Sequence, residues 1–317
     1  MQMKGKKAKA PKVPVKRVPL GKMVKRDIAL WMFVLPGLIL TFIFSYIPLY
    51  GVQIAFRDYV PRLGFFESPW VGLKYFKQFF ESPYFFITLK NTFIISIYSL
   101  IAGFPIPILL ALALNSFKHK RYRKVIQTVT YAPNFISVVV MCGMLTLFLS
   151  PSSGMINKII EMCGGEAVNF MANKDYWRHI YVWSGIWQSM GWNSIIYFAA
   201  LSNVSTDLHE AAVMDGASKL QVVWHIDLPS ILPTAIVMLI LSCGSILSVG
   251  FEKVFLLQNP LNKGVSEVIS TYVYQVGMIN NNPSYSSAIG LFNSAVNAVM
   301  LIVVNKIARK GAGISLY

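Results

Sequence analysis

The sequence predicts an all-α polytopic membrane protein with six transmembrane helices. Of its 317 residues, 55% are hydrophobic and only 13% are charged, whereas a typical soluble domain carries about 25% charged residues. The mean hydropathy is +0.54. So few charges cannot cover a globule of this size, so the composition argues against a soluble protein. It also excludes a disordered, collagen-like or coiled-coil chain.

Six stretches without Asp, Glu, Lys or Arg reach the length that a helix needs to cross a bilayer, about 20 residues. They are 28–56, 91–117, 125–157, 180–206, 228–251 and 268–305. The longest of these must also contain interfacial or loop residues. We therefore place the third span near 135–150, after Pro133, and the sixth near 285–304, after Pro283. The first is too long for a signal peptide and precedes no small-residue cleavage pattern, so we expect it to be retained.

Basic residues are unevenly divided between the two sides that six spans define. The segments on the side of the termini, 1–27, 118–124, 207–227 and 306–317, hold 19 of the 29 lysines and arginines. Because basic segments stay on the cytoplasmic side, we expect both termini there. Residues 1–27 then form a basic tail on anionic lipid, 28–310 the membrane domain and 311–317 a second cytoplasmic tail. Binding of nucleic acid by the basic tail is the less favoured alternative.

The connection between the fourth and fifth spans departs from this charge pattern, because it holds four carboxylates and only one lysine, Lys219. Asp207 can cap a helix, with Glu210 three residues later as in a capping box. Gly216 is suited to the C-terminal stop. On these signals alone, the segment is either an amphipathic connector in the membrane interface or a short helix that docks on a partner.

Fixed positions of the segment 207–229 resemble the EAA loop of ATP-binding-cassette import permeases. The matching residues are Glu210-Ala211-Ala212, Gly216, Ile226 and Leu228-Pro229. Further segments resemble the sugar-importing, maltose-type branch and, within it, the permeases for complex oligosaccharides. They are Trp70-Val71-Gly72-Leu73, Tyr75-Phe76, Asn91-Thr92, Trp187-Gln188, Asp215-Gly216-Ala217 and Gly250-Phe251-Glu252. The resemblance covers roughly residues 25–310.

The resemblance implies a permease subunit of an ATP-driven, binding-protein-dependent importer of sugars, expected to be oligosaccharides, that works by alternating access in the bacterial cell membrane. Its partners would be a second related permease, two ATPase subunits and an extracytoplasmic solute-binding protein. The EAA loop would be a coupling helix that docks on the ATPase. The residues implied in this contact are Glu210, Ala211, Ala212, Asp215 and Gly216.

No motif for catalysis or metal binding accompanies these features. The sequence contains no Gly-x-x-x-x-Gly-Lys-Ser/Thr, His-Glu-x-x-His or Gly-x-Ser-x-Gly. The three cysteines, Cys142, Cys163 and Cys243, lack metal-ligand spacing. We therefore expect a non-catalytic subunit without a metal or cofactor of its own, in which ATP and Mg²⁺ are bound by the partner subunits.

Polar residues inside spans usually face the bundle interior or a water-filled cavity. The fourth span holds such residues at i, i+3, i+4 and i+7, on one helical face, and the fifth holds a pair at i, i+3. By the resemblance, both regions line the sugar path. The predicted path residues are Gly185, Gln188, Ser189, Trp192, Ser242 and Ser245. The alternative is that the small residues serve helix packing and that the tryptophan is an interface anchor.

Three other functions compete with a sugar importer. The same machinery could carry another solute class, the chain could be an ATP-independent channel or secondary transporter, or it could be a membrane scaffold or sensor. The aromatic residues of 57–90 are likewise open to two interpretations. They suit short amphipathic helices that receive a binding protein, and they also suit a membrane-interface belt.

Overall fold

The computed structural model describes residue 21 and residues 27–117 and 119–316. The basic tail predicted for residues 1–27 therefore lies almost wholly outside the described residues. Apart from one antiparallel bridge between Arg57 and Trp70, the regular structure of the described residues is helical. The all-α fold class is thus confirmed. The chain divides into two compact units, 1–53 and 54–317.

The first unit contains the helix α2, Ile28–Thr41, which continues through η1, Phe42–Tyr46, into η2, Ile47–Phe56, whose last three residues belong to the second unit. The stretch Leu30–Phe56 is 27 residues long. It is about 40 Å long at about 1.5 Å per residue, which exceeds the roughly 30 Å hydrocarbon core. The first predicted span therefore has the length and hydropathy of a transmembrane helix.

Three helical stretches of the second unit are also long and apolar enough to cross a membrane. In the first, α5, Pro83–Gly103, and α6, Pro105–Ser116, form one stretch of 34 residues. In the second, α12, Lys219–Val222, η4, Val223–Asp227, and α13, Leu228–Gly244, form one stretch of 26. The third is α17, Pro283–Ala312. These stretches correspond to the second, fifth and sixth predicted spans.

The third predicted span is broken. Its run forms α7, Lys120–Tyr131, then η3, Ala132–Phe135, and after a bend of 96° the helix α8, Val138–Phe148. Pro133 lies in the turn, and the Ser137 side chain accepts a hydrogen bond from the Val140 amide to start α8. With 11 residues, α8 is about 16 Å long and cannot cross a bilayer alone. The span predicted near 135–150 is therefore not confirmed as one helix, because its run forms two helices on either side of a bend.

The fourth predicted span corresponds to α10, Lys174–Leu201, which has 28 residues. Its length suffices for a crossing, but it is not among the helices that are also apolar enough. Polar residues such as Gln188 and Asn193 lower the hydropathy of its charge-free part. The described residues thus contain four helices that meet both criteria, or five if the bent pair counts as one span. The count of six is not confirmed in full.

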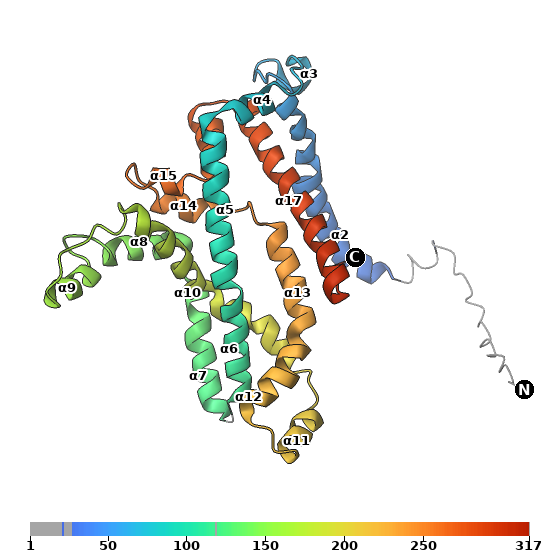
Figure 1. Cartoon of the computed structure of the whole chain (residues 1–317). Helices are drawn as coiled ribbons and strands as arrows, with labels where there is room; N and C mark the ends of the chain where they lie inside the picture. The colour runs from blue at the N-terminus through green and yellow to red at the C-terminus, as the bar shows by residue number, and fades with distance from the viewer. Residues whose placement is uncertain (1–20, 22–26, 118, 317) are drawn as a thin grey trace, which may run out of the picture. The chain divides into compact units, whose positions relative to one another are not determined.

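Short helices complete the second unit. They are α3, Gly64–Glu67; α4, Lys74–Glu81; α9, Met155–Met162; α11, Thr206–Met214; α14, Phe251–Leu257; α15, Lys263–Ser266; α16, Ile269–Tyr274; and η5, Gln275–Ile279. Within this unit, α11 and α12 lie near the end where α6 meets α7, whereas α3 and α4 lie at the opposite end (Figure 1). This arrangement agrees with the alternation of sides expected from the sequence.

The aromatic segment 57–90 has two kinds of residue. On α4, Tyr75 and Phe79 are buried in a cluster with Tyr272 and Tyr285, so that they fasten this helix to α16 and α17. Phe66 and Trp70 remain exposed. The segment thus contains a short amphipathic helix, α4, and part of its aromatic set is protein core rather than an outer surface.

Two further clusters hold the long helices together. Residues of α6, α10 and α13 meet around Leu112, Tyr197 and Ile231. Residues of α5, α10 and α14 meet around Ile95, Trp177 and Val254. The helix α10 thus contributes residues to both clusters, and a cavity lies between them.

Candidate functional site

A cavity of about 490 Å³ lies between α5, α6, α10, α13 and the chain from 245 to 253. This volume falls within the usual range of small-molecule sites, about 300–1,000 Å³. The wall is rich in hydroxyl groups, supplied by Ser96, Ser99, Ser189, Ser242, Ser245 and Ser248. Phe104, Tyr181 and Tyr197 add aromatic rings. Hydroxyls together with aromatic rings suit a ligand that has both polar edges and apolar faces.

The structure brings five of the six predicted path residues to this cavity, namely Gly185, Gln188, Ser189, Ser242 and Ser245. Trp192 is not among the lining residues. Its ring packs edge-on against Phe135, with ring centroids 6.0 Å apart, and its side chain is half exposed. Asn193 lines the cavity instead. The cavity face of α10 therefore follows Gly185, Ser189 and Asn193 at steps of four residues.

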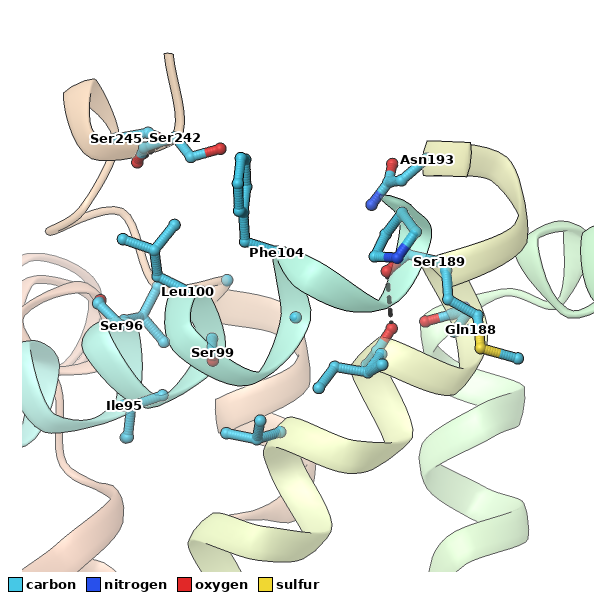
Figure 2. Close-up of a pocket in the computed structure, with 18 of the residues that line it drawn as sticks. Ile95, Ser96, Ser99, Leu100, Phe104, Gln188, Ser189, Asn193, Ser242 and Ser245 are labelled. Atoms are coloured by element: carbon cyan, nitrogen blue, oxygen red, sulfur yellow. Dashed lines mark hydrogen bonds between the residues drawn. The ribbon is translucent and has the colours of Figure 1, made fainter. Parts of the chain in front are cut away.

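Three of the six lining serines, Ser189, Ser242 and Ser245, donate to backbone carbonyls three or four residues earlier in the chain. Ser189 donates to Gly185 O at 2.8 Å and Ser242 to Met238 O at 2.8 Å. A hydroxyl that donates once keeps lone pairs that can accept from a ligand hydroxyl. In Figure 2, Phe104 stands between the serines of α13 and the polar face of α10.

Gln188 lines the cavity and also forms a hydrogen bond that connects two parts of the fold. Its Nε2 donates to Ile136 O at 2.7 Å, just beyond η3. This bond ties α10 to the bend between α7 and α8. The side-chain amide has a further donor hydrogen and an acceptor oxygen, which remain for other partners.

The sequence analysis missed several lining residues. Ser96 and Ser99 on α5 stand at i, i+3 inside an apolar run, and this spacing was a usable signal. Lys253 belonged to a predicted outer loop, and nothing in the sequence indicated that it would be buried. Its side chain enters the fold from α14 and is only 9% exposed.

Lys253 is held against α10. Its Nζ donates to Tyr181 O at 2.6 Å and lies 4.6 Å from the centroid of the Tyr181 ring. A Cβ at Gly185 would lie 3.0 Å from this Nζ. Glycine at 185 thus leaves room for the ammonium group, which is a packing reason for one predicted path residue.

The predicted EAA loop forms α11 and α12, but its N-cap differs from the prediction. The Ser205 side chain, not that of Asp207, accepts the capping bond, from the Asp207 amide at 3.2 Å. A capping box occurs at Ser218 and Gln221 instead. Gly216 ends α11 at a φ of +80°, as predicted. A non-glycine residue would be strained in this conformation.

The loop presents an exposed surface. Glu210, Ala211, Asp215 and Gly216 are exposed, and Ala212 is half-buried. Large apolar side chains beside them are also exposed, and they are Leu208, Val213, Met214, Leu220 and Trp224. A mixed acidic and apolar surface of this kind is typical of a protein contact.

One partly buried hydrogen-bonded pair anchors α11 to the long helices. His209 Nε2 donates to Asp227 Oδ1 at 2.9 Å, and Asn115 Nδ2 of α6 lies 3.4 Å from the same oxygen. The hydrogen bond to Asp227 raises the pKa of the His209 imidazole, and a contact with Ser205 O adds to this effect. We call His209, Asp227 and Asn115 the α11 latch.

Known proteins are similar to this chain in sequence. Residues 103–311 match the family described as binding-protein-dependent transport system inner membrane component. Protein LplB of Bacillus subtilis is 43% identical over 287 residues, covering 90% of each chain. The polygalacturonan/rhamnogalacturonan transport system permease protein YteP of the same organism is 43% identical over 281 residues, covering 89% of this chain and 88% of YteP.

A solved structure extends the likeness to three dimensions. It is the crystal structure of a bacterial alginate ABC transporter in complex with an alginate pentasaccharide-bound periplasmic protein. One of its chains superimposes with a TM-score of 0.85 at 38% sequence identity. The match covers 94% of this chain and 99% of the other.

Proposed function

Because the chain belongs to the family of binding-protein-dependent transport system inner membrane components, we propose that it is a permease subunit of an ATP-driven importer of oligosaccharides. Membership of this family and several helices of spanning length make it a multi-pass membrane protein. One relative is named for polygalacturonan transport, and the solved relative binds its periplasmic protein loaded with an alginate pentasaccharide. Both support a saccharide chain as the solute.

The observation that carries the proposal is the exposed surface of α11 and α12, at the end of the unit where α6 meets α7 (Figure 1). In the proposed complex this surface is the coupling helix and docks in a cleft of an ATPase subunit. Glu210 offers a carboxylate to a basic residue, since complementary charge orients docking. Ala211 and Ala212 allow close approach, Asp215 adds negative charge, and Gly216 provides the turn.

The complex would contain this chain, a second related permease, two ATPase subunits and a solute-binding protein at the outer face. ATP and Mg²⁺ belong to the ATPase subunits. The coupling surface and both termini would then be cytoplasmic, in the membrane of a bacterial cell. The cavity lined by Ser96, Gln188 and Ser242 would form part of the solute path.

A continuous helix would transmit the motion. The stretch Lys219–Gly244 starts in the coupling loop and ends at the cavity. Closure of the ATPases would move α11, the α11 latch would pass this movement to the base of α13, and the wall that carries Ser242 would shift. Alternating access follows if this movement opens the cavity to one side at a time.

Two measurements on the complex that copurifies with this chain test the proposal. In proteoliposomes, uptake of a labelled oligosaccharide should require both ATP and the ATPase subunits. Uptake that persists without the ATPase would favour a channel or a secondary transporter instead.

Cysteine cross-linking tests the docking surface. In a background that carries Cys163→Ser, which removes an exposed cysteine, Glu210→Cys should cross-link to the ATPase. The matched control is Phe66→Cys on α3, an exposed position at the opposite end of the unit, which should not. A Glu210→Cys variant that never reaches the ATPase in an active complex would overturn the coupling role.

A further inference from the structure

Lys253 is the one charged residue among the described residues that line the cavity. Its Nζ lies beside two other lining residues, Tyr181 and Gly185. The positive charge therefore stands in a wall otherwise made of hydroxyls, side-chain amides, aromatic rings and apolar side chains.

A buried ammonium group is costly unless an anion or several acceptors compensate it. Lys253 has one carbonyl acceptor and one ring face, and both favour the charged form. No carboxylate of the described residues forms an ion pair with it. The buried Glu267 is within 3.3 Å of Lys263 Nζ, so it has a cation of its own. An ammonium group has three donor hydrogens, and one is used on Tyr181 O, so two remain for a ligand.

The need to fasten α14 does not explain the charge. Trp177 Nε1 of α10 already donates to Leu257 O at 3.0 Å, and Val254 and Leu257 are buried in the same cluster. These contacts hold α14 without a cation, so the packing of α14 does not require the positive charge of Lys253.

We propose that the cavity binds acidic oligosaccharides of the uronate type, and that Lys253 forms an ion pair with a sugar carboxylate. The serine hydroxyls then accept from sugar hydroxyls, and Phe104 offers a ring to a sugar face. This inference rests on the proposed function and narrows it to a substrate class and one specificity-determining residue.

The first experiment compares uptake of a galacturonate trisaccharide and of neutral oligosaccharides of the same length by proteoliposomes that contain the complete complex. The Lys253→Met variant keeps the side-chain length and removes the charge. Uptake of the acidic trisaccharide should fall about 10- to 100-fold, because a hydrogen bond to a charged group contributes about 1.5–3 kcal/mol. The control is Lys310→Met, an exposed lysine in the last turn of α17. In this control, both uptake and basal ATPase activity should stay within about twofold of the unmodified complex.

Each result has a separate meaning. Equal uptake of the acidic trisaccharide by Lys253→Met and by the unmodified complex would overturn the role of Lys253. Uptake of neutral oligosaccharides alone by the unmodified complex would overturn the acidic class and leave the proposed function standing. Uptake of neither kind would refute the proposed function itself.

A second variant pair guards against misfolding of Lys253→Met. Ser189→Asp places a carboxylate in the cavity, where it competes with the ligand for Lys253 and repels its charge. Ser189→Asn has nearly the same shape without the charge. Uptake of the acidic trisaccharide should fall at least about 10-fold further in the Asp variant than in the Asn variant. Equal uptake by the two would contradict the inference.

Discussion

The α11 latch can be tested by removing its imidazole with His209→Ala. Asp227 is 3% exposed at its side chain and His209 is 30% exposed. A hydrogen bond to a charged group contributes about 1.5–3 kcal/mol. Since His209 is partly exposed to solvent, we reduce this to about 1–2 kcal/mol. The population with α11 released from α13 should therefore rise about 5- to 30-fold.

The sign of the pH dependence follows from the direction of the shift. Asp227 raises the pKa of His209 above its ordinary value of 6.5. The protonated imidazole is the stabilising form, so the contribution of the latch is complete below about pH 6.5. It is lost as the pH rises through the raised pKa. The latch should thus loosen towards alkaline pH, and His209→Ala should remove this dependence.

Hydrogen exchange of the backbone amides in 206–216, corrected for the intrinsic effect of pH, measures the released population. At pH 6 the exchange should be about 5- to 30-fold faster in His209→Ala than in the unmodified chain. The control is His225→Ala, because the only side-chain hydrogen bond of His225 among the described residues is local, to Gln221 O of its own helical turn at 2.9 Å. Equal exchange in His209→Ala and the unmodified chain at pH 6 would refute the reasoning, as would an unchanged pH dependence in the variant.

Two further predictions concern α10. A Cβ at Gly191 would lie 2.0 Å from Thr130 O of α7, whereas an ordinary contact is about 3.5 Å. Gly191→Ala should therefore lower the free energy of unfolding by about 1–3 kcal/mol and lower the thermal midpoint in detergent. Gly143→Ala, where the added Cβ meets nothing within 4 Å, is the control and should leave the midpoint nearly unchanged. Gln188→Ala should lower oligosaccharide uptake about fivefold, since it loses the bond to Ile136 O, whereas Trp192→Ala, outside the cavity, should transport normally. The reverse order in an uptake assay would show that the cavity is not the path.

The sequence predicted the places of four spanning stretches well, because a charge-free run of sufficient length has few other uses in a protein. It did not predict the bend in the third span, since a run without charges does not show where a helix bends. There Pro133 and the Ser137 cap divide one apolar run into two helices at 96°. The helix α10 is instead longer than its charge-free run, because it also includes Lys174, Asp175 and Arg178.

The sequence also identified the residues of the candidate site only in part. Positions i, i+3, i+4 and i+7 share a face only approximately, so the pattern included Trp192, which does not line the cavity, and missed Asn193, which does. Lys253 could not be found from the sequence, since lysines in connections are mostly exposed. Its burial depends on space at Gly185 and on a carbonyl at Tyr181, which lie more than sixty residues away in the chain.

Asp227 lies on the continuous helical stretch that joins the proposed coupling loop to the cavity. Asp227 ends η4, and Ser242 lies fifteen residues further along the same continuous helix, which corresponds to about 22 Å. A helix transmits displacement along its axis with little change in length, so a shift at the α11 latch reaches Ser242 without passing through a flexible loop. Two features allow bending within this stretch, the irregular turn η4 and Pro233 inside α13. A movement of α11 would therefore reach the cavity as a tilt of α13, and this tilt changes the distance between Ser242 and the polar face of α10.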